Sequence, residues 1–445
     1  MTSRWAAFSL GAAVGIALVA LRTWGISQHF WMLGEQIRDW TIALGSWRDL
    51  PLSGAPSTMG GRGLGPIYYW VLWAVRHAVG PWCSDLPHAG GIGISLMQSI
   101  ADTALLFAIW RRLGSLPLAV AVVVLAATNP IDLEISATIW NPPVAVAFVK
   151  TAIAVVLIAG ESIWWSVGAT TIAWLAVQAH SSAAFVALPI MAAFVAREMM
   201  ARRWLRAART ARAIVEVVLV LEVPYFIDRF RHPGEAIGPT GFVGRQASLN
   251  VFANTQSILG AFRFAAWPLQ SMPSGWLLVI AAAAAVCAAI ATRKDLPLAS
   301  VTFVPLLMAI AAFARWRGVI ESYWFLTLAP SMALTVGCAM TAIPRPAMAR
   351  GAAAVFLAVA LLGVPARYRQ TTMTMPVYGA LARGSVDIRR RAPAVADIVT
   401  DFELPRTSQR GFIYTTVLGG RLDPSAPYVA HIAGNGGVTF TSANR

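Results

Sequence analysis

The chain has 445 residues, of which 57% are hydrophobic and only 12% are charged. Soluble globular proteins carry about 25% charged residues, so this composition excludes an ordinary soluble domain and indicates a polytopic membrane protein. The formal net charge of +15 comes mostly from arginines in short links between apolar stretches. Such links set orientation in a membrane, so the charge predicts topology rather than nucleic-acid binding. The three cysteines are scattered, which excludes a disulfide framework and a paired-cysteine metal site.

Apolar windows long enough to span a bilayer, about 17 to 25 residues, recur along the chain. They predict about eleven transmembrane helices, near 5–23, 90–110, 116–130, 142–160, 162–178, 183–197, 213–227, 272–292, 296–314, 320–342 and 351–365. The first window runs on into Arg22 and Trp24 without a small-residue cleavage site, so we expect an uncleaved first helix.

One further apolar stretch, 66–80, decides the topology. If it crossed the membrane, the arginine-rich segment 197–212 would lie on the outer side with the acidic first loop, against the positive-inside rule. Its two tyrosines, two tryptophans, Arg76 and His77 are typical of the headgroup level. We therefore expect an interfacial helix here, a cytoplasmic N-terminus and an outer C-terminus.

This topology places three segments outside: a first loop at 23–89, a second loop at 228–271 and a tail at 366–445. In the tail, 386–402 reads as an amphipathic helix, and 411–420 and 428–441 read as short strands. The predicted architecture is an all-α polytopic membrane domain, 1–365, followed by a small α/β domain, 366–445.

An acid pair opens the first loop in the sequence EQIRD. Glu35 and Asp39 are four residues apart, so on a helix they share one face, with Arg38 beside them. Such a pair can act as a general base or help to bind Mg²⁺, Mn²⁺ or Ca²⁺. Ordinary surface acids on an interfacial helix are the alternative. The Gly- and Pro-rich segment 51–66 follows, where Arg62 and free backbone N–H groups suit an anionic group.

The stretch EQIRDW…LPLSGAPSTMGGRGLGPIYYW resembles the first outer loop of bacterial GT-C integral-membrane glycosyltransferases. These are related to protein O-mannosyltransferases and the lipid A aminoarabinose transferase, and commonly show D-Q-A-R-D, L-P-L-x-G-P and G-P-L-Y-Y-Y. The resemblance implies a GT-C fold, a catalytic acid at Glu35 assisted by Asp39, and substrate contacts from Arg38, Tyr68 and Tyr69. Glu35 stands where these relatives have Asp.

Three downstream segments are also similar to this family. They are NPIDLEISATIWNPP with Asn141, VQAHSSAAF with His180 and ESYWFLTLAP with Tyr323, and the resemblance implies that these residues contact substrate. Many relatives have Asp at the position of Asn141. An amide cannot serve as a base, so Asp132 and Glu134, in the same outer loop, are candidates for a second acid.

A polyprenyl-phosphate donor needs cations at the outer surface, where positive charge is otherwise disfavoured. Arginines that break the positive-inside pattern are therefore candidate phosphate ligands, with contact to anionic lipid as the alternative. Such arginines are Arg315 and Arg317, and Arg229, Arg231, Arg245 and Arg263 in the second loop, with Arg245 and Arg317 as the leading candidates. The side chain of Lys150 is expected to extend outward, toward the predicted outer site. Asp102 lies in the middle of a predicted helix and is expected to make an interhelical hydrogen bond.

These observations predict a glycosyltransferase of the bacterial inner membrane, with its active site on the periplasmic side. It would move a sugar from a polyprenyl-phosphate donor to a lipid, polysaccharide or protein acceptor, with no nucleic-acid partner. A divalent cation is a candidate cofactor. A lipid or glycolipid transporter, with Asp102 and Lys150 on its path, and a non-catalytic subunit with this fold are the alternatives.

Overall fold

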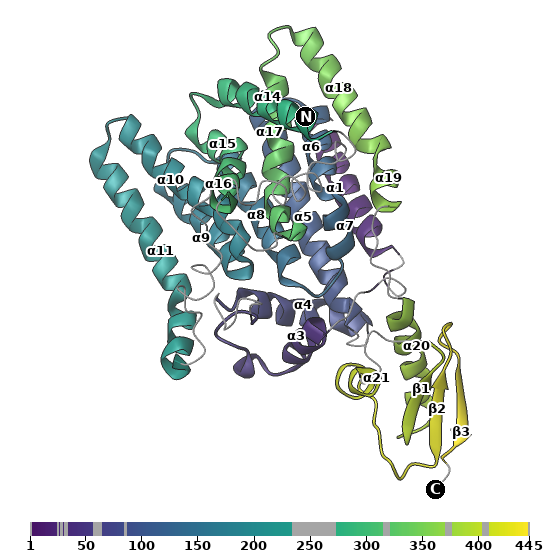
Figure 1. Cartoon of the computed structure of the whole chain (residues 1–445). Helices are drawn as coiled ribbons and strands as arrows, with labels where there is room; N and C mark the ends of the chain where they lie inside the picture. The colour runs from purple at the N-terminus through teal and green to yellow at the C-terminus, as the bar shows by residue number, and fades with distance from the viewer. Residues whose placement is uncertain are drawn as a thin grey trace.

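The computed structural model describes residues 2–24, 26, 30, 34–56, 65–83, 87–233, 273–314, 321–369, 376–402 and 409–443. Helices dominate these ranges, and a small sheet lies near the C-terminus (Figure 1). The long helices of the body are α1 (Thr2–Thr23), α5 (His88–Leu113), α6 (Leu116–Ala127), α8 (Asn141–Ile158), α9 (Ile163–Ala179), α10 (Ala184–Met200), α11 (Trp204–Arg231), α14 (Ser274–Thr292), α17 (Ala329–Thr341) and α18 (Pro346–Leu362).

The core of the bundle forms around α5 and α8. Helix α5 packs against α1, α4 (Ile67–Cys83), α6 and α8, while α9 packs on α8 and is covered in turn by α10 and α11. Small residues allow the close approach of α5 to its neighbours. A Cβ added to Gly91 would lie 2.0 Å from the carbonyl oxygen of Ala137, so only glycine fits where α5 meets the 136–139 link.

Each of the eleven predicted windows contains helix. Several of these helices are apolar, as in a multi-pass membrane protein. Among the described residues, five helical segments are long and apolar enough to cross a membrane: 88–113, 141–158, 181–200, 323–341 and 346–368. Shorter apolar helices cover 8–23, 116–127, 278–292 and 303–313. The window 296–314 is broken into α15 (Leu296–Ser300) and α16 (Phe303–Phe313). Helix α11 continues to Arg231, beyond the predicted limit at 227.

The interfacial helix predicted in the first loop is present. Helix α3 (Gly34–Leu44), the short turn η1 (Trp47–Asp49) and α4 lie at one end of the bundle (Figure 1). Helix α4 covers the predicted interfacial stretch 66–80 and packs on both α3 and α5. The links α10–α11 and α14–α15 lie at the opposite end, which the arginine pattern predicts to be cytoplasmic.

The tail folds as α19 (Val364–Arg369), α20 (Pro376–Arg391) and a sheet in the order β1 (Asp397–Thr400), β2 (Tyr428–Ile432), β3 (Val438–Ser442). Strands β1 and β2 are parallel, with Ile398 opposite Ala430, and β2 and β3 are antiparallel, with Ala430 opposite Phe440. The division of the chain at 366 stays a prediction.

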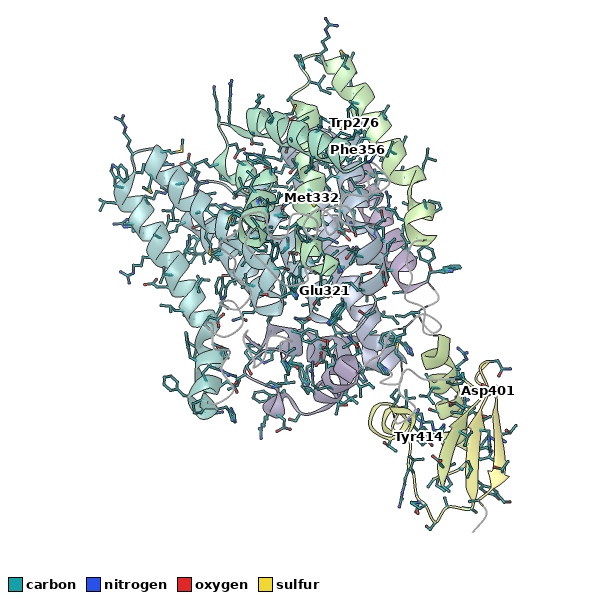
Figure 2. The ribbon with its side chains drawn as sticks, in the orientation of Figure 1. Trp276, Glu321, Met332, Phe356, Asp401 and Tyr414 are labelled. Carbon is teal, nitrogen blue, oxygen red and sulfur yellow. The ribbon has the colours of Figure 1, made fainter. Side chains whose placement is uncertain are left out.

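Two predictions for the tail are wrong. The helix expected over 386–402 ends at Arg391, because Pro393 cannot continue it, and 397–400 forms β1. The segment 411–420, expected as a strand, instead forms α21 (Gln409–Phe412) and η6 (Ile413–Val417). Packing overrides its β-branched composition, because η6 contacts α3 and buries Ile413 and Tyr414 (Figure 2).

Candidate functional site

Helix α3 carries the predicted acid pair with two different environments. Glu35 lies in its first turn, where a negative charge suits the helix dipole, and its side chain is exposed. Asp39 lies one turn later and is only 1% exposed, beside the fully buried Trp40. The shared face predicted for Glu35 and Asp39 therefore runs from solvent into the protein.

Three side chains hold the Asp39 carboxylate. Arg38 donates from Nε to Asp39 Oδ1 at 2.8 Å, and its Nη2 lies 2.7 Å from the same oxygen. The hydroxyl of Tyr69 donates to Oδ1 at 3.1 Å, and that of Tyr68 donates to Oδ2 at 3.0 Å. Both oxygens are thus occupied, so this arrangement assigns Asp39 to positioning Arg38 and joining α3 to α4.

Electrostatics reinforce this role. Burial raises the pKa of Asp39 above its usual value, although Arg38 and the two tyrosines favour the charged form. Burial, followed by the neighbouring charge of Asp39, raises the pKa of Tyr68 well above 10, so its hydroxyl remains a donor at neutral pH. The side chain of Arg38 is 34% exposed, which leaves it accessible to an anionic group outside α3.

The charge of Glu35 is felt electrostatically on α3 and on the bundle. Its charge acts on Arg38 and also on Tyr323, which belongs to η5 (Ser322–Leu328). Glu321 precedes η5 and lies at the end of the helical body nearest α3 and α4 (Figure 2). The helix that carries the first-loop acid and the distant ESYW segment therefore lie at the same end of the helical body.

Aromatic rings and a histidine surround Tyr323. The ring of Trp140 lies 4.7 Å from that of Tyr323, and the ring of His180 lies 5.8 Å away in an edge-on arrangement. His180 Nδ1 accepts from the Ser182 backbone N–H at 3.3 Å and lies 2.7 Å from Ser182 Oγ. Ser182 Oγ is 3.0 Å from Thr327 Oγ1.

These contacts fix the state of His180. Since Nδ1 accepts from a backbone N–H, the neutral ring carries its proton on Nε2. Burial lowers the pKa of His180 to about 4, so the ring is neutral at pH 7. His180 can therefore donate one hydrogen bond to a sugar or phosphate oxygen, but it supplies no positive charge.

Asn141 lies at the start of α8 and has a structural partner. Its Nδ2 donates to the carbonyl oxygen of Ala179 at 2.9 Å, which joins the beginning of α8 to the end of α9. The side chain is only half-buried. Its Oδ1 is the atom with which it can contact substrate.

Asp132, a candidate second acid, lies in a buried charged cluster rather than in an open site. It belongs to α7 (Pro130–Ile135), and its Oδ2 accepts from Arg22 Nη2 at 2.8 Å. The other arginine nitrogen, Nη1, lies 2.8 Å from Asp102 Oδ2, and Lys150 Nζ lies 2.9 Å from Asp102 Oδ1 and 3.6 Å from Asp132 Oδ2. All four side chains are fully buried.

This charged cluster, Arg22, Asp102, Asp132 and Lys150, is balanced and closed. Gln98 bridges it further, since its Nε2 donates to Asp132 Oδ1 at 3.0 Å and its Oε1 accepts from Lys150 at 2.8 Å. Asp132 has a lowered pKa, because Lys150 and Arg22 outweigh the effect of burial. The outward reach predicted for Lys150 is wrong, and the interhelical bond predicted for Asp102 is present.

The remaining predicted residues are placed only in part. Glu134 lies in α7 with an intermediate exposure. Most of the arginines predicted to bind phosphate lie outside the described residues: Arg62, Arg245, Arg263, Arg315 and Arg317. Among the residues that the structure describes, no group of three or more His, Cys, Asp or Glu side chains is arranged to hold a metal ion.

Two contributors were missed in the sequence. The ring of Trp140 lies beside that of Tyr323 at an angle of 50°, although only Asn141 was selected from the W-N-P motif. Arg22 did carry a signal, because it lies at the end of the first helix that is predicted to be outer, where an arginine breaks the positive-inside pattern as clearly as those selected for phosphate. The same rule therefore selects a structural arginine as well as candidate ligands.

Comparison with known proteins supports the fold. No family model and no curated protein matches the chain by sequence. ArnT from Cupriavidus metallidurans bound to undecaprenyl phosphate aligns with a TM-score of 0.55 and 14% identity, over 95% of this chain and 86% of that chain. The apo state of the same protein gives a TM-score of 0.58 and 12% identity, over 95% and 85%. An oligosaccharyltransferase from Archaeoglobus fulgidus gives 0.45 and 12%, over 95% and 65%.

ArnT, the lipid A aminoarabinose transferase, is a GT-C glycosyltransferase. The chain therefore has an ArnT-like fold, and the resemblance seen in the first-loop motifs is confirmed at the level of the fold.

Proposed function

We propose that this protein is a membrane glycosyltransferase that moves a sugar from a polyprenyl-phosphate donor to an acceptor hydroxyl at the outer face of a bacterial inner membrane. One observation carries the proposal. On α3, an exposed acid, Glu35, lies one turn before the fixed Asp39–Arg38 pair, at the end of the helical body where Glu321 precedes η5. ArnT, which shares the fold, binds undecaprenyl phosphate, and this supports the donor class.

The chemistry requires a base, a held phosphate and a leaving group. In this proposal Glu35 takes the proton of the acceptor hydroxyl while the acceptor oxygen forms a bond to the anomeric carbon. The bond between that carbon and the phosphate oxygen breaks, so polyprenyl phosphate leaves and the anomeric configuration inverts. Arg38, oriented by Asp39, would stabilise the departing phosphate.

The other residues would orient the sugar. His180 offers a neutral donor, Asn141 an amide oxygen, and Trp140 with Tyr323 an aromatic surface for a sugar face. Tyr68 and Tyr69 would act through Asp39 rather than on substrate, because both hydroxyls are committed to its carboxylate. A divalent cation at Glu35 remains part of the proposal; it would take further oxygens from phosphate and water.

No observation favours transport. Asp102 and Lys150, on which the transporter alternative rests, pair with each other inside the bundle with no exposed surface. A substrate path through them would require both charges to leave their partners, at a cost of several kcal/mol.

The test is turnover of a panel of polyprenyl-phosphate sugars by the purified full-length protein, read as release of polyprenyl phosphate. Loss of a general base typically lowers the rate by about 10² to 10⁴, and we expect this of Glu35→Gln. Asp49→Asn, which removes another exposed first-loop acid, is the matched control and should keep the wild-type rate. A Glu35→Gln protein as fast as wild type would refute the assignment of the base. Absence of wild-type turnover on every donor, with lipid, polysaccharide and protein acceptors each supplied, would favour the non-catalytic subunit.

A further inference from the structure

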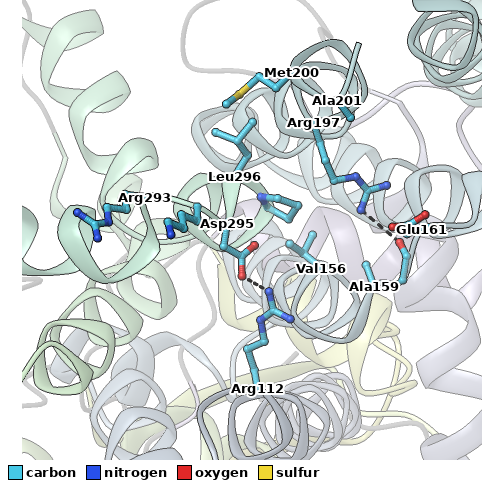
Figure 3. A pocket seen from close by; sticks show the side chains of 13 residues that line it. Arg112, Val156, Ala159, Glu161, Arg197, Met200, Ala201, Arg293, Asp295 and Leu296 are labelled. Atoms are coloured by element: carbon cyan, nitrogen blue, oxygen red, sulfur yellow. Dashed lines mark hydrogen bonds and ion pairs between the residues drawn. The ribbon is translucent and has the colours of Figure 1, made fainter. Parts of the chain in front are cut away.

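A cavity of about 610 Å³ opens at the end of the bundle opposite α3 (Figure 3). It is formed by the ends of α5, α8 and α10 and by the link between α14 and α15. Its charged lining consists of Arg112, Arg197, Arg293, Lys294, Glu161 and Asp295. Cations thus outnumber acids two to one in the lining of this cavity. The proposed transfer reaction does not use the cavity.

Both oxygens of Asp295 are already engaged. Its Oδ1 accepts from the backbone N–H of Leu298 at 3.2 Å and caps α15, while its Oδ2 pairs with Arg112 Nη2 (Figure 3). This ion pair joins the end of α5 to the link between α14 and α15. Asp295 therefore fixes the shape of the cavity, and it is not free to neutralise the two cations that precede it.

The second acid is engaged as well. Glu161 Oε2 lies 3.2 Å from Arg203 Nη1 and 3.9 Å from Arg206 Nη1, both on the arginine-rich segment that begins α11. Arg197 pairs with the buried Glu198 at 3.1 Å and donates to the carbonyl oxygen of Gly160 at 3.2 Å. Arg197 and Arg112 are thus held in place on two sides of the cavity.

Arg293 and Lys294 differ from these arginines. Both are exposed, and within the described part of the chain neither has an acidic partner within 4.0 Å. Arg293 and Lys294 are adjacent on the link that leads into the capped helix α15, and both line the cavity. They supply charge and donors that an external anion can use.

We propose that this cavity binds a phosphate-bearing anionic group. A phosphoryl group offers several acceptor oxygens and at least one negative charge, which suits two anchored guanidinium groups and two free cations. The lining also has an apolar, exposed member, because Met200 is 71% exposed. Such a lining is typical of the membrane interface, where the headgroup of an anionic phospholipid presents this chemistry.

The experiment measures thermal stabilisation of the full-length protein in detergent by three probes: phosphatidylglycerol, phosphatidylcholine and inorganic phosphate. We compare wild type with Arg293→Ala/Lys294→Ala. The control, Arg345→Ala/Arg350→Ala, removes the same charge from exposed residues on the α17–α18 link and α18, outside the cavity. For each probe that stabilises the wild-type protein, the measured quantity is the probe concentration that gives half of the maximal stabilisation. We expect this concentration to rise about tenfold or more in the cavity variant only.

The arms identify the source of the phosphate. Stabilisation by phosphatidylglycerol alone, lost in the cavity variant, supports a lipid headgroup, and the same pattern with inorganic phosphate supports a free phosphate. Equal weakening in both double variants would overturn the proposal, because surface charge in general would then explain binding. Absence of stabilisation by either phosphate-bearing anion, or an effect of phosphatidylcholine equal to that of phosphatidylglycerol, would also overturn it.

Discussion

The charged cluster inside the bundle and the acid pair on α3 are built from similar kinds of side chain but differ in exposure. In the cluster, Asp102 and Asp132 each contact both Arg22 and Lys150, and none of these side chains is exposed. On α3, Asp39 is saturated in the same way by Arg38 and two tyrosines, while Glu35 is left open. Saturation of an acid by its neighbours therefore separates these structural carboxylates from Glu35, the exposed carboxylate to which we assign the proposed chemistry.

The largest effect should follow from breaking the cluster. Replacing Asp132 by Asn removes one of two negative charges and leaves Arg22 and Lys150 with one carboxylate between them. Removing one partner of a buried ion pair typically destabilises a protein by about 3–5 kcal/mol. We expect a comparable loss in thermal or denaturant unfolding in detergent. A change below about 1 kcal/mol would show that the cluster is not closed as described.

Loss of either tyrosine hydroxyl on Asp39 should have a smaller effect. Tyr68→Phe and Tyr69→Phe each remove one hydrogen bond to a charged group, which is worth about 1.5–3 kcal/mol. If Asp39 only positions Arg38, both variants should also slow sugar transfer while leaving the protein folded at neutral pH. Transfer at the wild-type rate in both would break the link between Asp39 and the site.

The pH dependence of stability should distinguish the two buried aspartates. The pKa of Asp132 is lowered from 3.8, so its stabilisation is complete above pH 3.8 and is lost as the pH falls through its folded pKa. The pKa of Asp39 is raised from 3.8, so its contribution is present below pH 3.8 and is lost as the pH rises through its folded pKa. Melting curves in acid should therefore depend less steeply on pH in Asp132→Asn and more steeply in Asp39→Asn. Slopes that change in the same direction would contradict this assignment.

The smallest effect is expected at Glu35. Its side chain is exposed, and surface substitutions usually change the free energy of unfolding by less than about 0.5 kcal/mol. Glu35→Gln should therefore have the same melting temperature as the wild-type protein even though its transfer activity is lost. A destabilisation as large as that of Asp132→Asn would mean that Glu35 belongs with the structural acids.

The sequence predicted the helices far better than the roles of the charges. Apolar windows and interrupting arginines located the helices because each signal is local, and Pro393 marks an end of helix that could have been read in advance. The partnership of Arg22 with Asp132 spans 110 residues and leaves no local pattern. For the same reason EQIRD predicted one face for Glu35 and Asp39 but not that α4 would bury only the second acid.

The charged cluster also constrains the order in which the helices can pack together during synthesis. Arg22 precedes its partner Asp102 by 80 residues and Asp132 by 110, so the first helix is made long before any counter-ion exists. A guanidinium at its outer end is costly in lipid while it is unpaired. The newly made first helix must therefore keep Arg22 in contact with water or an insertion factor until α5 and α7 arrive, and only then can the bundle close around it.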